Sequence, residues 1–249
     1  MDDELVRAWR VAEREPGVVL LDGFHALKHA LRFGGEVRRV LAADRGALLA
    51  LAGELAPDVV PALEGLAVEV PEAVLRGVVP RVHPTGVVAL AVRPSAEANA
   101  AVLGRRPRRA PVVVLENPRN LGNVGAVIRL AAGFGATGVV TTGDLDPWHP
   151  NVLRGSAGLH FATAVERVGP AELPAGPLFV LDPEGADIRD VPFPDDALLA
   201  FGTERHGVSA ELKARADQLV AVPMQPGVSS FNLATSVAMG LFHWMSGKR

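Results

Sequence analysis

The sequence contains no cysteine among its 249 residues. This absence excludes a disulfide framework, a thiolate nucleophile, an iron–sulfur cluster and a cysteine-ligated zinc ion. No apolar run approaches the roughly 18 to 20 residues that a membrane-spanning helix needs. The first residues, 1–4, are acidic, whereas a secretory signal begins with basic residues. We therefore expect a cytoplasmic protein that does not interact with a membrane.

Tyrosine is absent, and lysine is nearly so. Lys28, Lys213 and Lys248 are the only lysines, so almost every basic residue is arginine. Arginine suits bidentate recognition of phosphate, although a GC-rich genome would produce the same preference. The net charge is −3, whereas a general nucleic-acid-binding domain is usually strongly basic. Any contact with nucleic acid must therefore come from local basic patches.

A segment rich in proline and arginine divides the chain into two parts. Residues 94–110 combine prolines and small residues with the densest positive charge in the sequence. This composition is typical of a linker, and it predicts domains at residues 1–93 and 111–249. The linker is either a solvated hinge or a strap that binds RNA phosphates through Arg105, Arg106, Arg108 and Arg109.

The front part alternates short apolar runs with helical patterns, which predicts a small α/β domain. Strands are expected at residues 18–21, 37–43, 66–70 and 86–92, with helices at 24–33 and 45–55. His25 and His29 lie one helical turn apart, but without a third ligand nearby they do not predict a metal site. Arg38 and Arg39 are candidates for an RNA-binding face, with solvated surface arginines as the alternative.

The rear part alternates strands and helices more clearly. Apolar runs predict strands at 111–115, 138–142, 178–181, 198–202 and 219–222, separated by helices at 123–134, 151–157, 209–216 and 232–245. This alternation favours a mostly parallel sheet covered by helices on both faces. The six residues 133–138 fit the G-x-G-x-x-G pattern, but they end a helix instead of beginning one, so we interpret them as a C-cap and turn. A nicotinamide-dependent oxidoreductase therefore gains little support.

A polar segment, residues 116–129, follows the first strand of the rear part and runs into a helix. Such strand-to-helix junctions are where α/β proteins bind ligands. Glycines surround Arg129 on one face of that helix, which would let a phosphate or a backbone approach it. Arg129 is therefore a candidate catalytic residue, or a surface arginine. Asn123 is a candidate site residue, or a helix N-cap.

Two further polar segments end predicted strands. In residues 202–209, Glu204 lies at the carboxyl end of a strand, where it belongs to a site or caps the next helix. Residues 222–233 pass through a loop of proline and glycine into a helix that begins near Ser230 and Asn232. Capping accounts for one of these polar residues but not for all of them. The helix beyond is apolar nearly all round, which favours burial against a second subunit.

In this order, the three segments resemble the signature motifs of the SpoU/TrmH family of RNA ribose 2′-O-methyltransferases. The resemblance covers about residues 111–249. Its elements are N-x-G-x-x-x-R beginning at Asn123, F-G-x-E-x-x-G-x-S beginning at Phe201, and V-P-M followed by S-x-N at Ser230 and Asn232. We therefore expect the α/β fold of that family, the SPOUT fold, in which the C-terminal segment forms a trefoil knot.

The front part resembles, more weakly, the small L30e-like RNA-binding domain that many family members carry. The similarity lies in residues 22–27 and 83–89. Because such a domain accompanies members that act on ribosomal RNA, the resemblance favours ribosomal RNA as substrate. Transfer RNA is the alternative, and enzymes that methylate ribosomal RNA to confer antibiotic resistance share the same two-part layout. A non-catalytic RNA-binding protein of this fold is a further alternative, which a failure to bind S-adenosyl-L-methionine would support.

The resemblance implies that S-adenosyl-L-methionine is the cofactor and that no metal is needed. It places the cofactor site in the knotted loops, largely on main-chain groups, at Gly202, Val222, Met224, Phe231 and Leu233. The family usually has leucine where this chain has Phe231. The resemblance also implies a homodimer that forms through the knot region, in agreement with the apolar last helix.

The same resemblance implies catalytic roles for Arg129, Asn123, Glu204, Ser230 and Asn232. The enzyme must hold the ribose oxygen, the methyl carbon and the sulfur in line, and orientation can supply roughly 7 to 11 kcal/mol of the barrier. Some accounts of the family make the arginine a general base. Because a guanidinium stays protonated far above neutral pH, we expect Arg129 to clamp a phosphate and polarise the hydroxyl. The other four residues would position the ribose and the loops.

Overall fold

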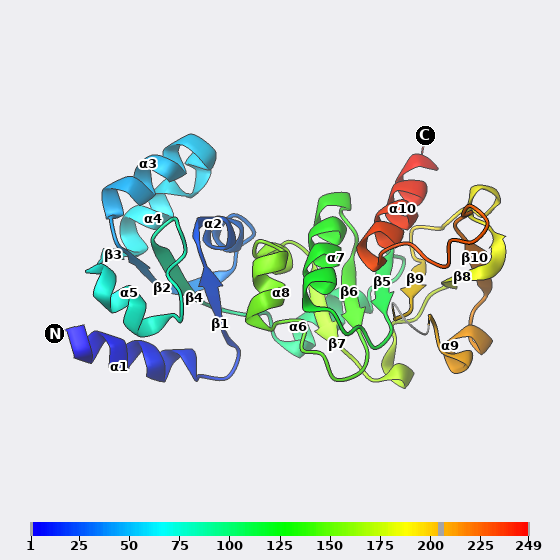
Figure 1. Ribbon diagram of the computed structural model, residues 1–249, viewed down its shortest axis with the longest axis horizontal. Helices are drawn as coiled ribbons and strands as arrows, with labels where there is room; N and C mark the ends of the chain where they lie inside the picture. The colour runs from blue at the N-terminus through cyan, green and yellow to red at the C-terminus, as the bar shows by residue number, and fades with distance from the viewer. Residues whose placement is uncertain (1, 204–206, 249) are drawn as a thin grey trace. The chain divides into compact units, whose positions relative to one another are not determined.

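The computed structural model describes residues 2–203 and 207–248. The chain divides into two compact units (Figure 1). Unit 1 contains Met1–Ser95 and Ala157–Ala162, and unit 2 contains Ala96–Ser156 and Thr163–Arg249. Within the described residues, no helix is both long enough and apolar enough to cross a membrane.

Unit 1 is built on a four-stranded sheet with the order β1–β4–β2–β3. β4 pairs antiparallel with β1 and β2, and β2 pairs parallel with β3. The strands are β1 (Val18–Asp22), β2 (Glu36–Ala42), β3 (Ala67–Glu69) and β4 (Val87–Val92). The helices are α1 (Asp2–Glu13), α2 (Phe24–Arg32), α3 (Arg45–Leu55), α4 (Val60–Leu66) and α5 (Glu72–Val78). Short 3-10 turns lie at Pro57–Val59 and Leu159–Phe161.

Unit 2 is built on a six-stranded sheet with the order β10–β8–β9–β5–β6–β7, and each of these pairings is parallel. The strands are β5 (Val112–Leu115), β6 (Gly138–Thr141), β7 (Ala164–Arg167), β8 (Leu178–Asp187), β9 (Leu198–Phe201) and β10 (Gln218–Ala221). The helices are α6 (Ala96–Leu103), α7 (Leu121–Phe134), α8 (Pro150–Gly155), α9 (Ala210–Ala214) and α10 (Leu233–Ser246). Short 3-10 turns lie at Pro170–Glu172 and Ile188–Asp190. The predicted α/β fold with a parallel sheet is therefore confirmed, and the trefoil knot stays a prediction.

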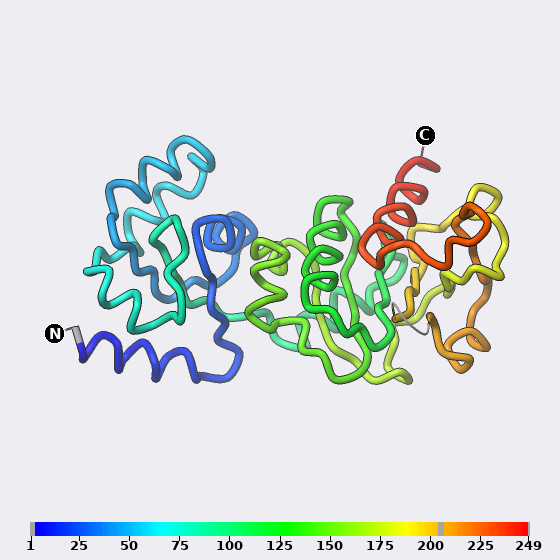
Figure 2. Tube along the Cα trace, in the orientation of Figure 1, coloured from blue at the N-terminus to red at the C-terminus, as the bar shows by residue number. Residues whose placement is uncertain are grey.

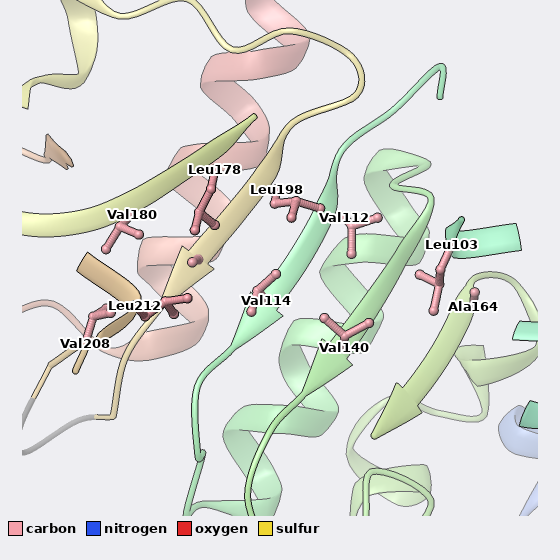
Figure 3. Close-up of a cluster of buried hydrophobic side chains, with 11 residues drawn as sticks. Leu103, Val112, Val114, Val140, Ala164, Leu178, Val180, Leu198, Val208 and Leu212 are labelled. Atoms are coloured by element: carbon pink, nitrogen blue, oxygen red, sulfur yellow. The ribbon is translucent and has the colours of Figure 1, made fainter. Parts of the chain in front are cut away.

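Helices cover both faces of the sheet in unit 2. On one face, valines of β5 and β6 pack with Leu103 of α6 and Leu212 of α9, as Figure 3 shows. Because side chains alternate along a strand, Val113 and Leu115 lie on the opposite face. The helices α7 and α10 cover that second face and pack against each other. A fully buried strand such as β5 therefore needs the continuous apolar run that the sequence shows.

Residues 96–110 are not a separate linker but belong to unit 2. Residues 96–103 form α6, which packs against the edge strand β7. The buried side chain of Asn99 donates a hydrogen bond of 2.9 Å to the carbonyl oxygen of Val165 in that strand. Composition alone suggested a linker because alanine, proline and arginine dominate here, whereas tertiary contacts hold the segment in place.

The glycine-rich segment at the end of α7 is a helix terminus, as expected. α7 ends at Phe134, and Gly135 adopts the left-handed conformation with φ 69°. β6 then begins at Gly138. The apparent dinucleotide motif is thus a C-cap followed by a strand.

The strands of unit 2 carry the site at one edge of their sheet. Because the strands are parallel, the loops that follow β5, β9 and β10 leave from the same edge. Figure 2 follows the chain from β10 through residues 222–232 into α10, which lies against α7. The three polar segments identified in the sequence are these three loops.

Candidate active site

A cavity of about 370 Å³ lies between the middle of β8 and the ends of β9 and β10. Its volume falls within the usual range for small-molecule sites. The ends of these strands and the start of α10 supply its walls. The lining includes all five residues expected at the cofactor, together with one expected catalytic residue: Gly202, Val222, Met224, Phe231, Leu233 and Ser230. The fold therefore gathers residues that are separated in sequence by the helix α9 and the strand β10.

The cavity depends on a close approach of two main-chain segments at Gly202. A Cβ atom at this position would lie 2.0 to 2.3 Å from main-chain atoms of Gly207 and Val208. Only glycine fits there without displacing the backbone. The amides of Thr203 and Gly207 donate to each other's carbonyl oxygens at 3.0 Å and hold the loop together. Gly202, Thr203 and Gly207 all line the cavity, and the main-chain cofactor site that the resemblance implies stays a prediction.

Asn232 joins the third loop to the first. Its Oδ1 accepts hydrogen bonds from the amides of Ala234 at 2.9 Å and Thr235 at 3.4 Å, which caps α10. Its Nδ2 donates to Oδ1 of Asn123 at 3.1 Å. The cap of α7 is Asn120, whose Oδ1 accepts from the amide of Asn123 at 3.0 Å. The side chain of Asn123 is thus not needed as a cap and binds α10 instead.

A second link joins the first loop to the beginning of α9, and the sequence analysis assigned it no role. The carboxylate of Glu116 accepts hydrogen bonds from the amide of Ser209 at 2.7 Å and from its hydroxyl at 2.6 Å. The hydroxyl of Ser209 also caps α9 by accepting from the amide of Leu212. Glu116 follows β5 directly. A carboxylate at the carboxyl end of a strand was the feature of the sequence that could have indicated a role for this residue. Glu204 lies outside the described residues.

Asp182 brings a charge to the cavity. Its side chain is only 5% exposed, and its Oδ2 forms an ion pair with Nζ of Lys213. Its Oδ1 accepts from the amide of Glu184 at 3.0 Å. Burial raises the pKa of Asp182, but the hydrogen bonds from Lys213 and Glu184 outweigh burial and hold this pKa below its ordinary value. Asp182 is therefore ionised at neutral pH.

Arg129 lies outside this cavity. It is exposed on α7 and is not one of the cavity's lining residues. It follows Asn123 by six positions, which corresponds to about 9 Å along a helix axis. Of the expected catalytic residues that the structure describes, only Ser230 lines the cavity. Asn232 stands between the lining residues Phe231 and Leu233 and binds Asn123, whereas Arg129 has no such link to the cavity.

An open groove of about 540 Å³ lies beside the beginning of α7. Residues 119–122 and the α8 residues Asn151, Arg154 and Gly155 line it. The helices approach closely, since a Cβ atom at Gly125 would lie 2.7 Å from the carbonyl oxygen of Val152. Arg119 and Arg154 are exposed, and the amino end of α7 adds partial positive charge. The groove therefore suits an anionic ligand, and the sequence analysis did not single out either arginine.

The arginines expected to bind RNA have different surroundings. Arg39, Arg105 and Arg109 are exposed. Arg38 forms ion pairs with Glu36 at 2.9 Å and Glu15 at 2.6 Å, and Arg106 pairs with Asp196 at 2.8 Å. These pairs lie at the surface, where RNA phosphates can replace a carboxylate partner at little cost.

Arg108 does not fit the expected RNA contact. Its side chain is buried, and its guanidinium donates to the carbonyl oxygens of Leu103 at 3.1 Å, Ala175 at 2.8 Å and Asp196. Burial lowers the pKa of Arg108. The side chain therefore holds three chain segments of unit 2 together and is not available to a phosphate.

Comparisons with known proteins agree with this site. The family described as "SpoU rRNA Methylase family" matches residues 110–242. A tRNA/rRNA methyltransferase of Synechocystis, itself called uncharacterized, is 28% identical over 92% of this chain and 84% of that protein. A 23S rRNA (uridine(2479)-2′-O)-methyltransferase of Streptomyces viridochromogenes is 32% identical, over 52% of this chain and 50% of that protein.

Solved structures show the same fold over the whole chain. The crystal structure of an RNA 2′-O ribose methyltransferase has a TM-score of 0.73 and 27% identity, and it covers 98% of this chain and 95% of that one. An AdoMet-bound rRNA methyltransferase from Sinorhizobium meliloti has a TM-score of 0.78 and 22% identity, with coverage of 100% and 97%.

The fold and the site define an α/β protein with a parallel sheet, a small-molecule cavity and polar loops at the carboxyl edge of that sheet, and the matching family model makes it a methyltransferase. The chain belongs to the SpoU rRNA methylase family. The predicted class of enzyme, an RNA methyltransferase, is thereby confirmed, and the oxidoreductase alternative is excluded.

Proposed function

We propose that this chain transfers the methyl group of S-adenosyl-L-methionine to a ribose 2′-hydroxyl of ribosomal RNA. The observation that carries the proposal is the cavity between β8 and the ends of β9 and β10, which gathers the residues expected at the cofactor from the family's motifs. The names of relatives support the substrate, since the protein of Streptomyces viridochromogenes is a 23S rRNA 2′-O-methyltransferase. We place the reaction in the cytoplasm.

The residues that line the cavity fit S-adenosyl-L-methionine. Val222, Met224 and Leu233 offer apolar surface to an adenine ring, and the bare main chain at Gly202 offers hydrogen-bonding groups at close range. Phe231, which is 39% exposed, adds an aromatic face at the cavity's rim. When bound, the cofactor supplies a methyl group that the positive charge on its sulfur already activates.

The chain's own residues hold the reacting ribose. The hydrogen bond between Asn232 and Asn123 fixes the start of α10 against the start of α7, and Ser230 stands two residues before that cap, at the cavity. Ser230 is thus placed to bind the ribose, while Arg129 clamps the adjoining phosphate and polarises the 2′-hydroxyl. Orientation of this kind supplies roughly 7 to 11 kcal/mol toward the barrier.

A homodimer would supply Arg129 to the cavity. Phe242 and Met245 are 60% and 42% exposed on α10, whose opposite side is buried against the rest of unit 2. An exposed apolar stripe on an otherwise packed helix is typical of a subunit interface. Because Arg129 lies outside its own chain's cavity, we propose that it serves the cavity of the partner.

The RNA backbone is proposed to follow the open groove beside α7. Arg119 and Arg154 border this groove, which contains Asn120 and Gly122 of the first motif loop. Guanidinium groups recognise phosphate by paired hydrogen bonds, and the amino end of α7 favours the same charge. The groove thus lies beside Asn123, where the ribose is to be held, because its lining residue Gly122 directly precedes Asn123 in α7.

The test of this proposal uses the purified chain, tritiated S-adenosyl-L-methionine and two unmodified RNAs in separate reactions, ribosomal and transfer. We expect label in the ribosomal RNA. Label in transfer RNA alone would support methyl transfer but contradict ribosomal RNA as the substrate. A chain that neither binds the cofactor nor labels either RNA would contradict the proposed function and would favour a non-catalytic RNA-binding protein.

A further inference from the structure

A single ionised side chain lines the cofactor cavity. Of the described residues that form its walls, Asp182 alone is acidic or basic; the others are apolar, glycine, proline, serine or threonine. The carboxylate is 5% exposed. A charge held this far from water acts over the whole cavity, because little solvent screens it. The cavity is therefore not neutral.

The positive charge that pairs with Asp182 is that of Lys213, which does not line the cavity. Lys213 belongs to α9 and is not a lining residue, and its side chain is 31% exposed. Solvent screens Lys213 more than Asp182 for that reason. From inside the cavity, the negative member of the pair is nearer and less screened. Among the described residues, the pair therefore contributes a negative potential where a ligand binds.

This potential distinguishes the two ligands that the proposed function requires. S-adenosyl-L-methionine carries a positive sulfonium in addition to its ammonium and carboxylate groups. Methyl transfer forms a carbon–oxygen bond on the ribose, leaves the electron pair of the broken carbon–sulfur bond on sulfur, and releases the hydroxyl proton. The product, S-adenosyl-L-homocysteine, is thus a thioether without the sulfonium charge. The cofactor is attracted to the cavity's field, and its product is attracted less.

We propose that Asp182 makes the cavity selective for the cofactor, which carries the sulfonium charge, over the product, which has no net charge, and that Lys213 modulates this selectivity. The proposal rests on the proposed function, since it assumes that the cavity binds S-adenosyl-L-methionine. Its consequence is that the product leaves more readily than it would from a neutral cavity. Asp182 and Lys213 act through charge, so changes in their charges must shift the two affinities unequally.

The test compares affinities for the two ligands by isothermal titration calorimetry at pH 8, with the full chain and three variants. Asp182→Asn removes the negative charge, Lys213→Met removes the positive charge, and Asp182→Glu keeps the charge. We expect Asp182→Asn to weaken the cofactor by on the order of ten-fold relative to the product. We expect Lys213→Met to shift the same ratio in the opposite direction and Asp182→Glu to preserve it.

A merely structural pair would behave differently, because both single variants would then weaken both ligands together. An unchanged ratio, or shifts of the same sign in Asp182→Asn and Lys213→Met, would overturn the inference. Sinefungin, which carries an amine near the position of the sulfonium, is expected to follow the cofactor and not the product. If the unaltered chain binds neither ligand, the proposed function fails. If it binds both, and the ratio of the two affinities is the same in the charge variants, only this inference fails.

Discussion

The side-chain amide of Asn232 donates to Oδ1 of Asn123 at 3.1 Å and thereby joins the starts of α10 and α7, 109 residues apart. Both residues belong to motifs that the sequence placed in different loops. The contact leaves Oδ1 of Asn232 free to cap its own helix. One side chain therefore stabilises α10 and positions it.

These two roles can be separated by substitution. Asn232→Asp keeps the capping oxygen and loses the amide donor, so the free energy of unfolding should change by less than about 0.5 kcal/mol, while turnover falls. Asn232→Ala loses both and should also destabilise the chain by about 1 kcal/mol. Chemical denaturation and initial rates measure the two effects. If Asn232→Asp turned over like the unaltered chain, the contact with Asn123 would have no part in catalysis.

Arg129→Ala is expected to lower methyl transfer at least about 100-fold, as loss of one group that stabilises developing charge commonly does. Cofactor affinity should stay nearly unchanged, because the proposed role of Arg129 is to bind the RNA phosphate and polarise the 2′-hydroxyl, not to contact the cofactor. Arg76→Ala is the matched control, since Arg76 is an exposed arginine paired with Glu72 in unit 1. Near-normal turnover in Arg129→Ala would remove this residue from the mechanism.

Complementation tests whether Arg129 serves the partner's cavity. Arg129→Ala and a cavity variant such as Gly202→Ala are each expected to be inactive alone. A mixed dimer has one intact cavity facing one intact Arg129, so mixing and re-equilibrating the two proteins should restore part of the activity. A mixture that stays inactive while mass spectrometry shows mixed dimers would contradict the proposed arrangement.

Gly202→Ala should abolish cofactor binding, because its Cβ would lie 2.0 to 2.3 Å from the main chain of Gly207 and Val208. Gly133→Ala is the matched control: nothing lies within 4 Å of a Cβ built there, and the residue is in α7. The control should stabilise the chain by roughly 0.5 to 1 kcal/mol. Calorimetry with the cofactor and thermal unfolding test both variants, and ordinary affinity in Gly202→Ala would refute the described loop contact.

The groove beside α7 predicts a change in RNA affinity. The double variant Arg119→Ala/Arg154→Ala should raise KM for RNA with a smaller effect on kcat. A plot of the logarithm of the RNA-binding constant against the logarithm of the salt concentration should become shallower by about 1 to 2 units. The reason is that binding releases fewer counterions when it makes fewer phosphate contacts. An unchanged salt slope would show that RNA does not follow this groove.

A half-buried histidine in unit 1, His29, predicts a dependence of stability on pH. Burial lowers the pKa of His29 from 6.5, although its Nδ1 lies 2.7 Å from the carbonyl oxygen of Ala157. The folded state then binds the proton less readily than the unfolded state, so this contribution is present above about pH 6.5 and is lost as the pH falls below it. Thermal unfolding between pH 5 and 8 should show this loss, and His29→Gln should reduce it. An equal pH dependence in both proteins would contradict the assignment.

Much of this architecture is predictable because β5, β6 and β9 are buried on both faces and must be continuously apolar. α3 was expected at 45–55 and spans Arg45–Leu55. The motif loops were equally visible, since polar residues interrupt apolar strands at one edge of the sheet. By contrast, α1 was not predicted, although half of its residues are apolar. It is held by Trp9, which is 1% exposed and packs against α5.

What the sequence did not predict depends on contacts between distant segments. Arg108 belongs to a basic cluster in the sequence, which suggested contact with RNA. Its guanidinium instead donates to carbonyl oxygens of segments up to 88 residues away. Asp182 looks like the end of an ordinary strand, and only the fold places Lys213 beside it. Asn120 and Asn123 are equally good caps by composition, and the geometry of α7 decides between them. Such choices need the tertiary structure.

The position of the transferred methyl group tests the central claim most directly. After reaction with tritiated S-adenosyl-L-methionine, the labelled RNA is digested to nucleosides and separated by chromatography, with Arg129→Ala as the control. The account predicts label in a single 2′-O-methyl nucleoside from ribosomal RNA and almost none with the variant. Label on a base, or a variant that labels RNA as the unaltered chain does, would contradict it.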